Sequence, residues 1–137
     1  MKSVLITGVS RGIGLSIAKE FIQNDYFVFG TSRSKFDLAK ALESSNCKHL
    51  IVDVNDRDSI ASVMKDIPGI NNTLDCLVNN AWLQICKDPW DYVEEDFDAI
   101  FNVNVKMPYF LSWGTRPLLK ASTAEGGGCI VNIGSVH

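Results

Sequence analysis

The sequence has little net charge, no long apolar run and no closely spaced cysteines. Its formal net charge is −3 over 137 residues, too weak a field to favour nucleic acid or an anionic membrane surface. No apolar run approaches the roughly 20 residues of a membrane-spanning helix, and the run at the amino end is too short for a secretory signal. We therefore expect a cytoplasmic protein with no nucleic-acid or membrane partner.

Clusters of metal-ligating residues are also missing. Four widely separated cysteines form no C-x-x-C pair: Cys47, Cys76, Cys86 and Cys129. Free thiols in a reducing compartment are favoured over disulfides or a metal centre. Neither of the two histidines has a ligand partner at a usable spacing, so no metal site is predicted.

What the sequence does contain is typical of one globular domain over residues 1–137. It is 46% hydrophobic and 21% charged, the composition of an ordinary folded protein. No internal repeat, low-complexity stretch or linker divides it.

The amino end joins a short apolar run to a glycine-rich turn and then to a helical pattern. Val4-Leu5-Ile6 is typical of a buried parallel strand. Gly8, Gly12 and Gly14 remove side chains where the backbone turns and approaches a ligand. The helix that follows begins with free N–H groups and a partial positive charge, which bind anions. The glycine spacing differs from the common G-x-G-x-x-G fingerprint, so an ordinary strand-to-helix turn remains the alternative.

Strand and helix patterns alternate along the rest of the chain. We predict strands at residues 4–6, 26–31, 49–52, 74–78 and 129–133, with helical patterns at 13–22, 36–42, 60–67 and 97–111 between them. This alternation predicts an α/β fold, a Rossmann-type doubly wound parallel sheet with strand order 3-2-1-4-5. Pro108 lies inside the last helical pattern and is expected to remove a hydrogen bond and kink that helix.

Polar residues or glycines stand at the end of each predicted strand. Because parallel strands end at the same edge of a sheet, ligands of such folds bind there. The candidate segments are Thr7–Gly14, Thr31–Arg33, Asp53-Val54, Asn79–Ala81 and Ser135. Five strand ends of this kind are harder to explain by packing than one glycine turn.

In their order and spacing, several motifs resemble the short-chain dehydrogenase/reductase family. They are Thr-Gly-x-x-x-Gly-Ile-Gly at Thr7–Gly14, Asp53-Val54, Asn79-Asn80-Ala81, Asn104 and Ile130–Ser135. The resemblance covers the whole chain. It implies a nicotinamide cofactor bound across the strand ends and a small carbonyl or alcohol as the substrate.

The resemblance also implies residue roles around the cofactor. The backbone from Ser10 to Ile13 would cradle the pyrophosphate, Asp53 and Val54 would hold the adenine, and Asn79 and Ala81 would line the nucleoside. The predicted cofactor-binding set is Gly8, Ser10, Arg11, Gly12, Ile13, Gly14, Ser32, Arg33, Asp53, Val54, Asn79 and Ala81.

Two residues are implied in catalysis. Ser135 would orient the substrate carbonyl or hydroxyl, and Asn104 would hold a helix kink that keeps a proton-relay water. A purely structural role stays open for each of these residues. Asn104 can be a helix residue whose amide bonds to a neighbouring backbone group, and Ser135 can be an ordinary strand-end serine. Asp53 can cap a turn, and Asn79-Asn80 can be turn formers.

Charge at the end of the second strand favours NADP(H) over NAD(H). An NAD site usually carries Asp or Glu roughly 20 residues past the glycines, to hold the ribose 2′-hydroxyl. Here the strand ends Thr31-Ser32-Arg33-Ser34 with no acid, and Arg33 can pair with a 2′-phosphate through two hydrogen bonds. Arg11 can approach the same phosphate. The alternative is two solvated arginines.

The family's acid–base pair, a tyrosine followed four residues later by a lysine, does not occur in this sequence. A free phenol with a pKa of ~10 needs a nearby cation to act as a base at neutral pH. Gly30, Asp96 and Trp113 stand four residues after the three tyrosines. We therefore expect no dehydrogenase turnover from this chain alone. A non-catalytic dinucleotide-binding or interaction module is the alternative function.

The family's sixth and seventh strands have no counterpart, so the sequence looks like the front half of such an enzyme. A fragment of a longer product, a truncated relic and a chain completed by another polypeptide all stay open. The fifth strand, with Ile130-Val131-Asn132-Ile133, would be an exposed apolar edge, and we expect self-association through it. Trp82 stands where the family usually has glycine and is expected to crowd the nicotinamide side of the site.

Overall fold

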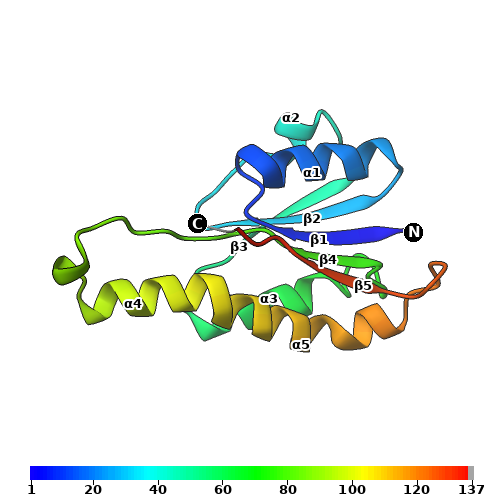
Figure 1. Cartoon of the computed structure of the whole chain (residues 1–137). Coiled ribbons are helices and arrows are strands. Elements are labelled where there is room, and N and C mark those ends of the chain that lie inside the picture. The colour runs from blue at the N-terminus through cyan, green and yellow to red at the C-terminus, as the bar shows by residue number, and fades with distance from the viewer. Residues whose placement is uncertain (136–137) are drawn as a thin grey trace.

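The structure, a computed structural model, describes residues 1–135 apart from the side chain of Arg57. Within that range it contains one five-stranded parallel sheet with the predicted order, β3-β2-β1-β4-β5 (Figure 1). The strands are β1 (Ser3–Thr7), β2 (Phe27–Ser32), β3 (Cys47–Ile51), β4 (Cys76–Asn79) and β5 (Cys129–Asn132). The helical segments are α1 (Gly12–Gln23), α2 (Leu38–Leu42), α3 (Arg57–Asp66), η1 (Pro89–Asp91), α4 (Glu94–Phe101), η2 (Asn102–Lys106) and α5 (Met107–Lys120).

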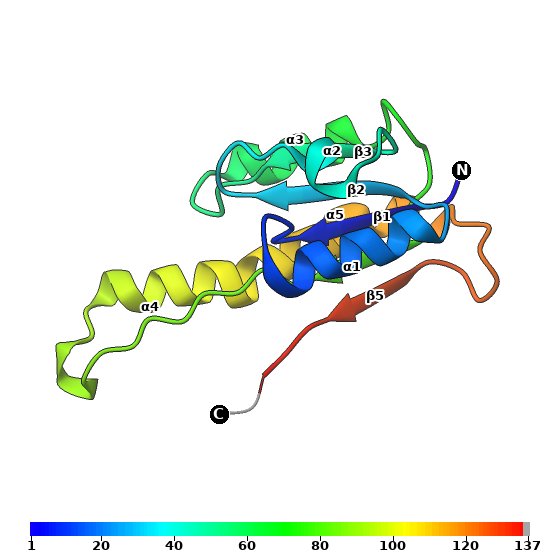
Figure 2. The ribbon, with the colours of Figure 1, turned by 90° about the horizontal axis from the view of Figure 1, so that it is seen from above.

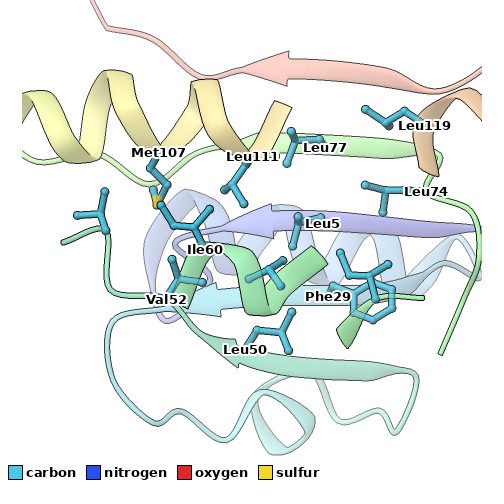
Figure 3. Packing of buried hydrophobic residues seen from close by; sticks show 13 residues of the cluster. Leu5, Phe29, Leu50, Val52, Ile60, Leu74, Leu77, Met107, Leu111 and Leu119 are labelled. Carbon is cyan, nitrogen blue, oxygen red and sulfur yellow. The ribbon is translucent and has the colours of Figure 1, made fainter. Parts of the chain in front are cut away.

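Helices cover both faces of the sheet (Figure 1). α1 and α2 lie on one face, and α3 and α5 lie on the other. Every residue of β1 and of β4 is buried, as expected for central parallel strands, which are apolar on both sides. The larger core cluster fills the α3/α5 face and includes Leu5, Phe29, Leu77 and Leu111 (Figure 3).

The helical stretch after residue 93 is interrupted just before Pro108. α4 ends at Phe101, η2 is a π-helix, and α5 begins at Met107, so that Pro108 lies inside a continuous run of helical residues. The N–H of Met107 donates to the carbonyl of Asn102, five residues back. Regular α-helical hydrogen bonding is thus broken directly before the proline, which has no N–H to donate. A kink at Pro108 stays a prediction.

β5 is an edge strand, as the sequence predicts. Among residues 1–135 it pairs with β4 alone and lies at the rim of the sheet (Figure 2). All four of its residues are exposed, with Ile130 at 42% and Val131 at 41%. No helix among residues 1–135 is both long enough and apolar enough to cross a membrane.

Gly14 is required by close packing, which gives a first prediction. A Cβ at Gly14 would lie 2.1 Å from the carbonyl oxygen of Gly8 and 2.5 Å from Nδ2 of Asn80. We expect Gly14→Ala to lower the free energy of unfolding by about 1–3 kcal/mol, since overpacking forces the backbone to shift. Urea denaturation measures the change, and Gly69→Ala, whose Cβ would meet its nearest atom at 3.5 Å, is the control. Equal stability of the two variants would contradict this account of the turn.

Candidate functional site

The turn from β1 to α1 is built on two glycines with positive φ. Gly8 has φ +75° and Gly12 has φ +58°, values that residues with a Cβ rarely adopt. The N–H groups of Gly8 and Val9 both donate to the carbonyl of Thr31, at 2.9 and 3.1 Å. The glycine turn is therefore fastened to the end of β2.

The amino end of α1 has no capping side chain. Its N-cap residue, Arg11, has extended backbone and makes no side-chain bond to the helix, and the first turn contains no acidic residue. Ser10, Arg11 and Ile13 are exposed, and a Cβ built on Gly12 would meet no atom within 4 Å. Uncapped N–H groups facing open space at a helix amino end suit a phosphate group.

Thr7 fixes the end of β4 through its hydroxyl. Its Oγ1 accepts hydrogen bonds from the backbone N–H groups of Asn80, at 3.0 Å, and Ala81, at 2.9 Å. Thr7 is 1% exposed, so water cannot replace these bonds. Sequence reasoning placed Thr7 in a candidate segment but missed this function. The available signal was a hydroxyl-bearing residue as the last residue of the strand, directly before the glycine turn.

Asn80 ties the same two strand ends from the other side. Its Nδ2 donates to the carbonyl oxygens of Thr7, at 3.0 Å, and Gly8, at 3.2 Å. The Asn80 side chain is buried and packs closely against Gly14, where a Cβ would collide with its Nδ2. Asn80 is thus a structural residue of the turn.

Asn79 has an unused buried acceptor. Its Nδ2 donates to Oδ1 of Asn132 on β5, at 2.8 Å, and to Oγ of Ser112 on α5, at 3.4 Å. Its Oδ1 is buried and has no hydrogen-bond partner among the described residues. A buried polar atom without a partner costs free energy, so a ligand hydroxyl that donates to Oδ1 would remove this cost. The arrangement fits the expected place of Asn79 beside a nucleoside.

The ends of β2 and β3 lie together at the same edge. The N–H of Val52 donates to the carbonyl of Ser32, at 3.0 Å, and Asp53 follows directly. Asp53 Oδ1 accepts a hydrogen bond from the N–H of Asn55, at 2.9 Å. This is the bond expected if Asp53 caps the turn. Val54 is buried, whereas Arg33 is exposed. Neither Arg33 nor Arg11 is in an ion pair with any residue whose side chain the structure describes.

Ser32 has a partner that sequence reasoning did not find. Its hydroxyl donates to the carbonyl of Ser34, at 2.8 Å, and lies 2.7 Å from Nε2 of His49 on β3. Burial lowers the pKa of His49, which favours the neutral ring. This contact fixes the turn that presents Arg33.

Asn104 lies in the π-helix and holds the segment after β4. Its Oδ1 accepts from the N–H of Leu83, at 2.8 Å, and its Nδ2 donates to the carbonyl of Leu83, at 2.9 Å. This is the backbone partner that the structural interpretation of Asn104 describes. Further along, Lys87 pairs with Asp96, and this ion pair lowers the pKa of the Asp96 carboxyl. The segment therefore runs along α4 beyond the sheet (Figure 2).

Ser135 and Trp82 lie beyond the strand ends. Ser135 follows β5 and is exposed, and the N–H of Ile133 donates to the carbonyl of Asn79, at 3.0 Å, just before it. Trp82 follows β4 and is 66% exposed. A crowding contact of Trp82 with a bound cofactor stays a prediction.

The strand ends thus form one edge on which an uncapped helix, an unused amide oxygen and free arginines come together. A parallel sheet with this strand order and a glycine turn after its first strand defines a Rossmann-type nucleotide-binding fold. Comparison with known proteins narrows the class. The chain belongs to the short-chain dehydrogenase family, whose sequence model matches residues 2–137.

Individual relatives agree with this assignment. The chain is 32% identical to the 3-oxoacyl-acyl-carrier-protein reductase FabG of Haemophilus influenzae, over 98% of this chain and 55% of the relative. It is 31% identical to the NADP-dependent 3-hydroxy acid dehydrogenase YdfG of Salmonella typhi, over 96% of this chain and 53% of the relative.

Solved structures give the same fold. A short-chain dehydrogenase from Streptomyces avermitilis superposes with a TM-score of 0.85 and 29% identity, over 98% of this chain and 49% of that chain. The RhlG–NADP active-site complex of Pseudomonas aeruginosa superposes with a TM-score of 0.88 and 26% identity, over 98% and 54%. The chain therefore spans about half the length of the relatives that it matches.

Proposed function

We propose that this chain is the cofactor-binding half of an NADP(H)-dependent oxidoreductase that interconverts a carbonyl and an alcohol by hydride transfer. Membership of the family supplies the oxidoreductase class. The choice of NADP(H), the residue roles and the restriction to the cofactor half are inferences from the strand ends described above.

One observation carries the choice of cofactor: the end of β2 is cationic and is fastened to an uncapped helix. Gly8 and Val9 bond to Thr31, so the phosphate-binding turn and Arg33 belong to one edge of the sheet. A carboxylate at this position would repel a 2′-phosphate, whereas exposed guanidinium groups attract it. The NADP complex of the RhlG relative and the NADP-dependent YdfG relative support this choice.

The remaining roles follow from the same edge. The amino end of α1 would hold the pyrophosphate, Asn79 Oδ1 would accept from a nucleoside hydroxyl, and Asp53 and Val54 would flank the adenine. When bound, a reduced nicotinamide supplies the hydride that reduces a carbonyl carbon. Ser135 would donate its hydroxyl proton in a hydrogen bond to the carbonyl oxygen of the substrate. Asn104 would act as a positioning residue, because its amide groups are both engaged by Leu83.

A comparison of the binding affinities of two nucleotides tests the proposal without an activity assay. Adenosine 2′,5′-bisphosphate carries the 2′-phosphate of NADP, and AMP is the control without it. We expect the bisphosphate to bind at least tenfold more tightly, since one charge-assisted pair contributes about 1.5–3 kcal/mol. The salt dependence of binding is a second readout, because exposed charge pairs weaken as ionic strength rises. Equal affinity for the two nucleotides would overturn the assignment of NADP(H).

We also propose that the chain self-associates through the open edge of β5. An exposed strand with apolar side chains presents unpaired N–H and C=O groups to another chain, and Ile130 and Val131 are both more than two-fifths exposed. Sedimentation velocity at micromolar concentration is expected to show a dimer or larger species. Ile130→Lys is expected to shift it to monomer, because a charged edge disfavours pairing.

A second variant separates this edge from the other exposed apolar surface. Phe97, Phe101 and Val105 are exposed on α4 and η2, and Phe101→Lys places the same charge there. If Phe101→Lys dissociates the protein and Ile130→Lys does not, the β5 edge is not the contact. A monodisperse monomer of the unmodified chain would also contradict the proposal.

A further inference from the structure

Two of the four cysteines are brought together by the sheet. Cys76 begins β4 and Cys129 begins β5, and the register of this parallel pair places them directly opposite each other. Side chains of directly paired residues point to the same face of a sheet. Neighbouring strands lie about 4.8 Å apart, within the 4.4–6.8 Å range of Cα separations found in disulfides.

Two contacts, one with β4 and one with α5, hold the start of β5 in this register. Its own N–H donates to the carbonyl of Asp75, at 3.0 Å. The preceding Gly128 packs against α5 so closely that a Cβ there would lie 2.5 Å from the carbonyl oxygen of Leu119. The start of β5 is therefore fixed against both β4 and α5, although the strand lies at the sheet edge.

The two thiols have different environments. Cys76 is buried in the apolar cluster beneath α1, and Cys129 is exposed. Burial, and to a smaller extent the neighbouring Cys129, raise the pKa of the Cys76 thiol to about 12. Cys76 is thus a buried, protonated thiol, whereas the exposed Cys129 is the one that a reagent in solution reaches.

We propose that Cys76 and Cys129 are a redox-active pair that forms a reversible disulfide with a disulfide oxidant such as glutathione disulfide. The Cys129 thiolate attacks one sulfur of the oxidant, forms a mixed disulfide and releases one glutathione thiolate. The Cys76 sulfur then attacks Sγ of Cys129, loses its proton and releases the second glutathione. The chain loses two protons and two electrons, which together are two hydrogen atoms, and one glutathione disulfide becomes two glutathione molecules.

The bond would fasten β5 to β4, the strand beside it in the sheet. It closes a loop that includes α4, α5 and the segment between them, and a closed loop lowers the entropy of the unfolded chain. The other two cysteines have no such geometry: Cys47 donates to the carbonyl of Ser44, and Cys86 is exposed on the segment after β4. The inference does not depend on any cofactor.

The experiment treats the folded chain with glutathione disulfide and measures its intact mass and its alkylation by iodoacetamide. We expect a mass lower by two hydrogens, protection of Cys76 and Cys129 and continued alkylation of Cys86. Dithiothreitol is expected to reverse the loss of mass and the protection. Cys86→Ser is the matched control and should give the same disulfide.

Cys129→Ser separates the mechanism from other oxidation chemistry. Cys129 is exposed, so the variant should fold, which circular dichroism checks. It is expected to lose the fall in mass completely. A stable glutathione adduct on Cys129 with Cys76 still reduced would overturn the proposal, because the pair then cannot close. A Cys129–Cys129 bond between two copies would overturn it equally.

Discussion

Thr7→Val is expected to destabilise the protein more than any other single methyl-for-hydroxyl exchange in the fold. The two side chains have nearly the same shape, so the packing of β1 is preserved, but the N–H groups of Asn80 and Ala81 lose their acceptor. Each buried donor without a partner costs about 1–3 kcal/mol. We expect the free energy of unfolding to fall by about 2–6 kcal/mol, measured by urea denaturation.

Thr115→Val is the matched control for this exchange. Thr115 is also fully buried, but its hydroxyl donates to the carbonyl of Leu111, one turn earlier in α5. That carbonyl keeps a helical partner, so the loss is expected to stay near 1 kcal/mol. If both variants lose the same stability, the hydroxyl of Thr7 does not fasten β4 to the glycine turn.

Arg33→Ala is expected to have the largest effect on cofactor choice. If Arg33 pairs with the 2′-phosphate, the variant should bind NADPH about 10- to 100-fold more weakly and bind NADH unchanged. Arg33→Lys should lose part of this affinity, because an ammonium group keeps the charge but not the two parallel hydrogen bonds. Isothermal titration calorimetry gives both dissociation constants.

The control for this variant is another exposed arginine. Arg116 lies on α5, away from the strand ends, so Arg116→Ala changes the net charge equally without touching the site. A similar loss of NADPH affinity in both variants would indicate a general charge effect. An equal loss of NADPH and NADH affinity in Arg33→Ala would mean that Arg33 does not contact the 2′-phosphate.

The sequence predicts the fold well because its central strands are buried on both faces. Runs such as Val4-Leu5-Ile6 are uniformly apolar, and the helices between them have one apolar face, so strand order and layer arrangement follow from general rules of parallel sheets. The structure confirms the order 3-2-1-4-5. Most element ends lie within three residues of the prediction, because hydrogen bonds and not hydrophobicity define them. The exception is the last helical pattern, predicted to end at residue 111, where the helix continues to Lys120.

Contacts between distant residues were not predictable in the same way. Asn104 and Leu83 are joined by an amide-to-backbone pair, and Ser32 contacts His49. Such contacts depend on how loops and strands meet in space, which single-residue patterns do not encode. The π-helix before Pro108 was missed because a proline signals a break in helical hydrogen bonding but not the form that the helix takes beside it.

The residues of the candidate site also differ in how far the sequence predicts their roles. Residues of the glycine turn were found because glycine has few other reasons to recur at this spacing. The roles of Thr7 and Asn80 were not, because threonine and asparagine serve many local purposes. Only the structure distinguishes Asn80, whose Nδ2 donates to two backbone carbonyls of the glycine turn, from Asn79, whose buried Oδ1 has no partner among residues 1–135.

The most direct test of the account is a calorimetric titration of the unmodified chain with NADPH and, separately, with NADH. The account predicts one site per chain, with NADPH bound at least tenfold more tightly than NADH at low ionic strength. Equal affinities would contradict the role given to Arg33 and Arg11. Absence of binding by either nucleotide would contradict the central claim that these strand ends form a cofactor site in the chain itself.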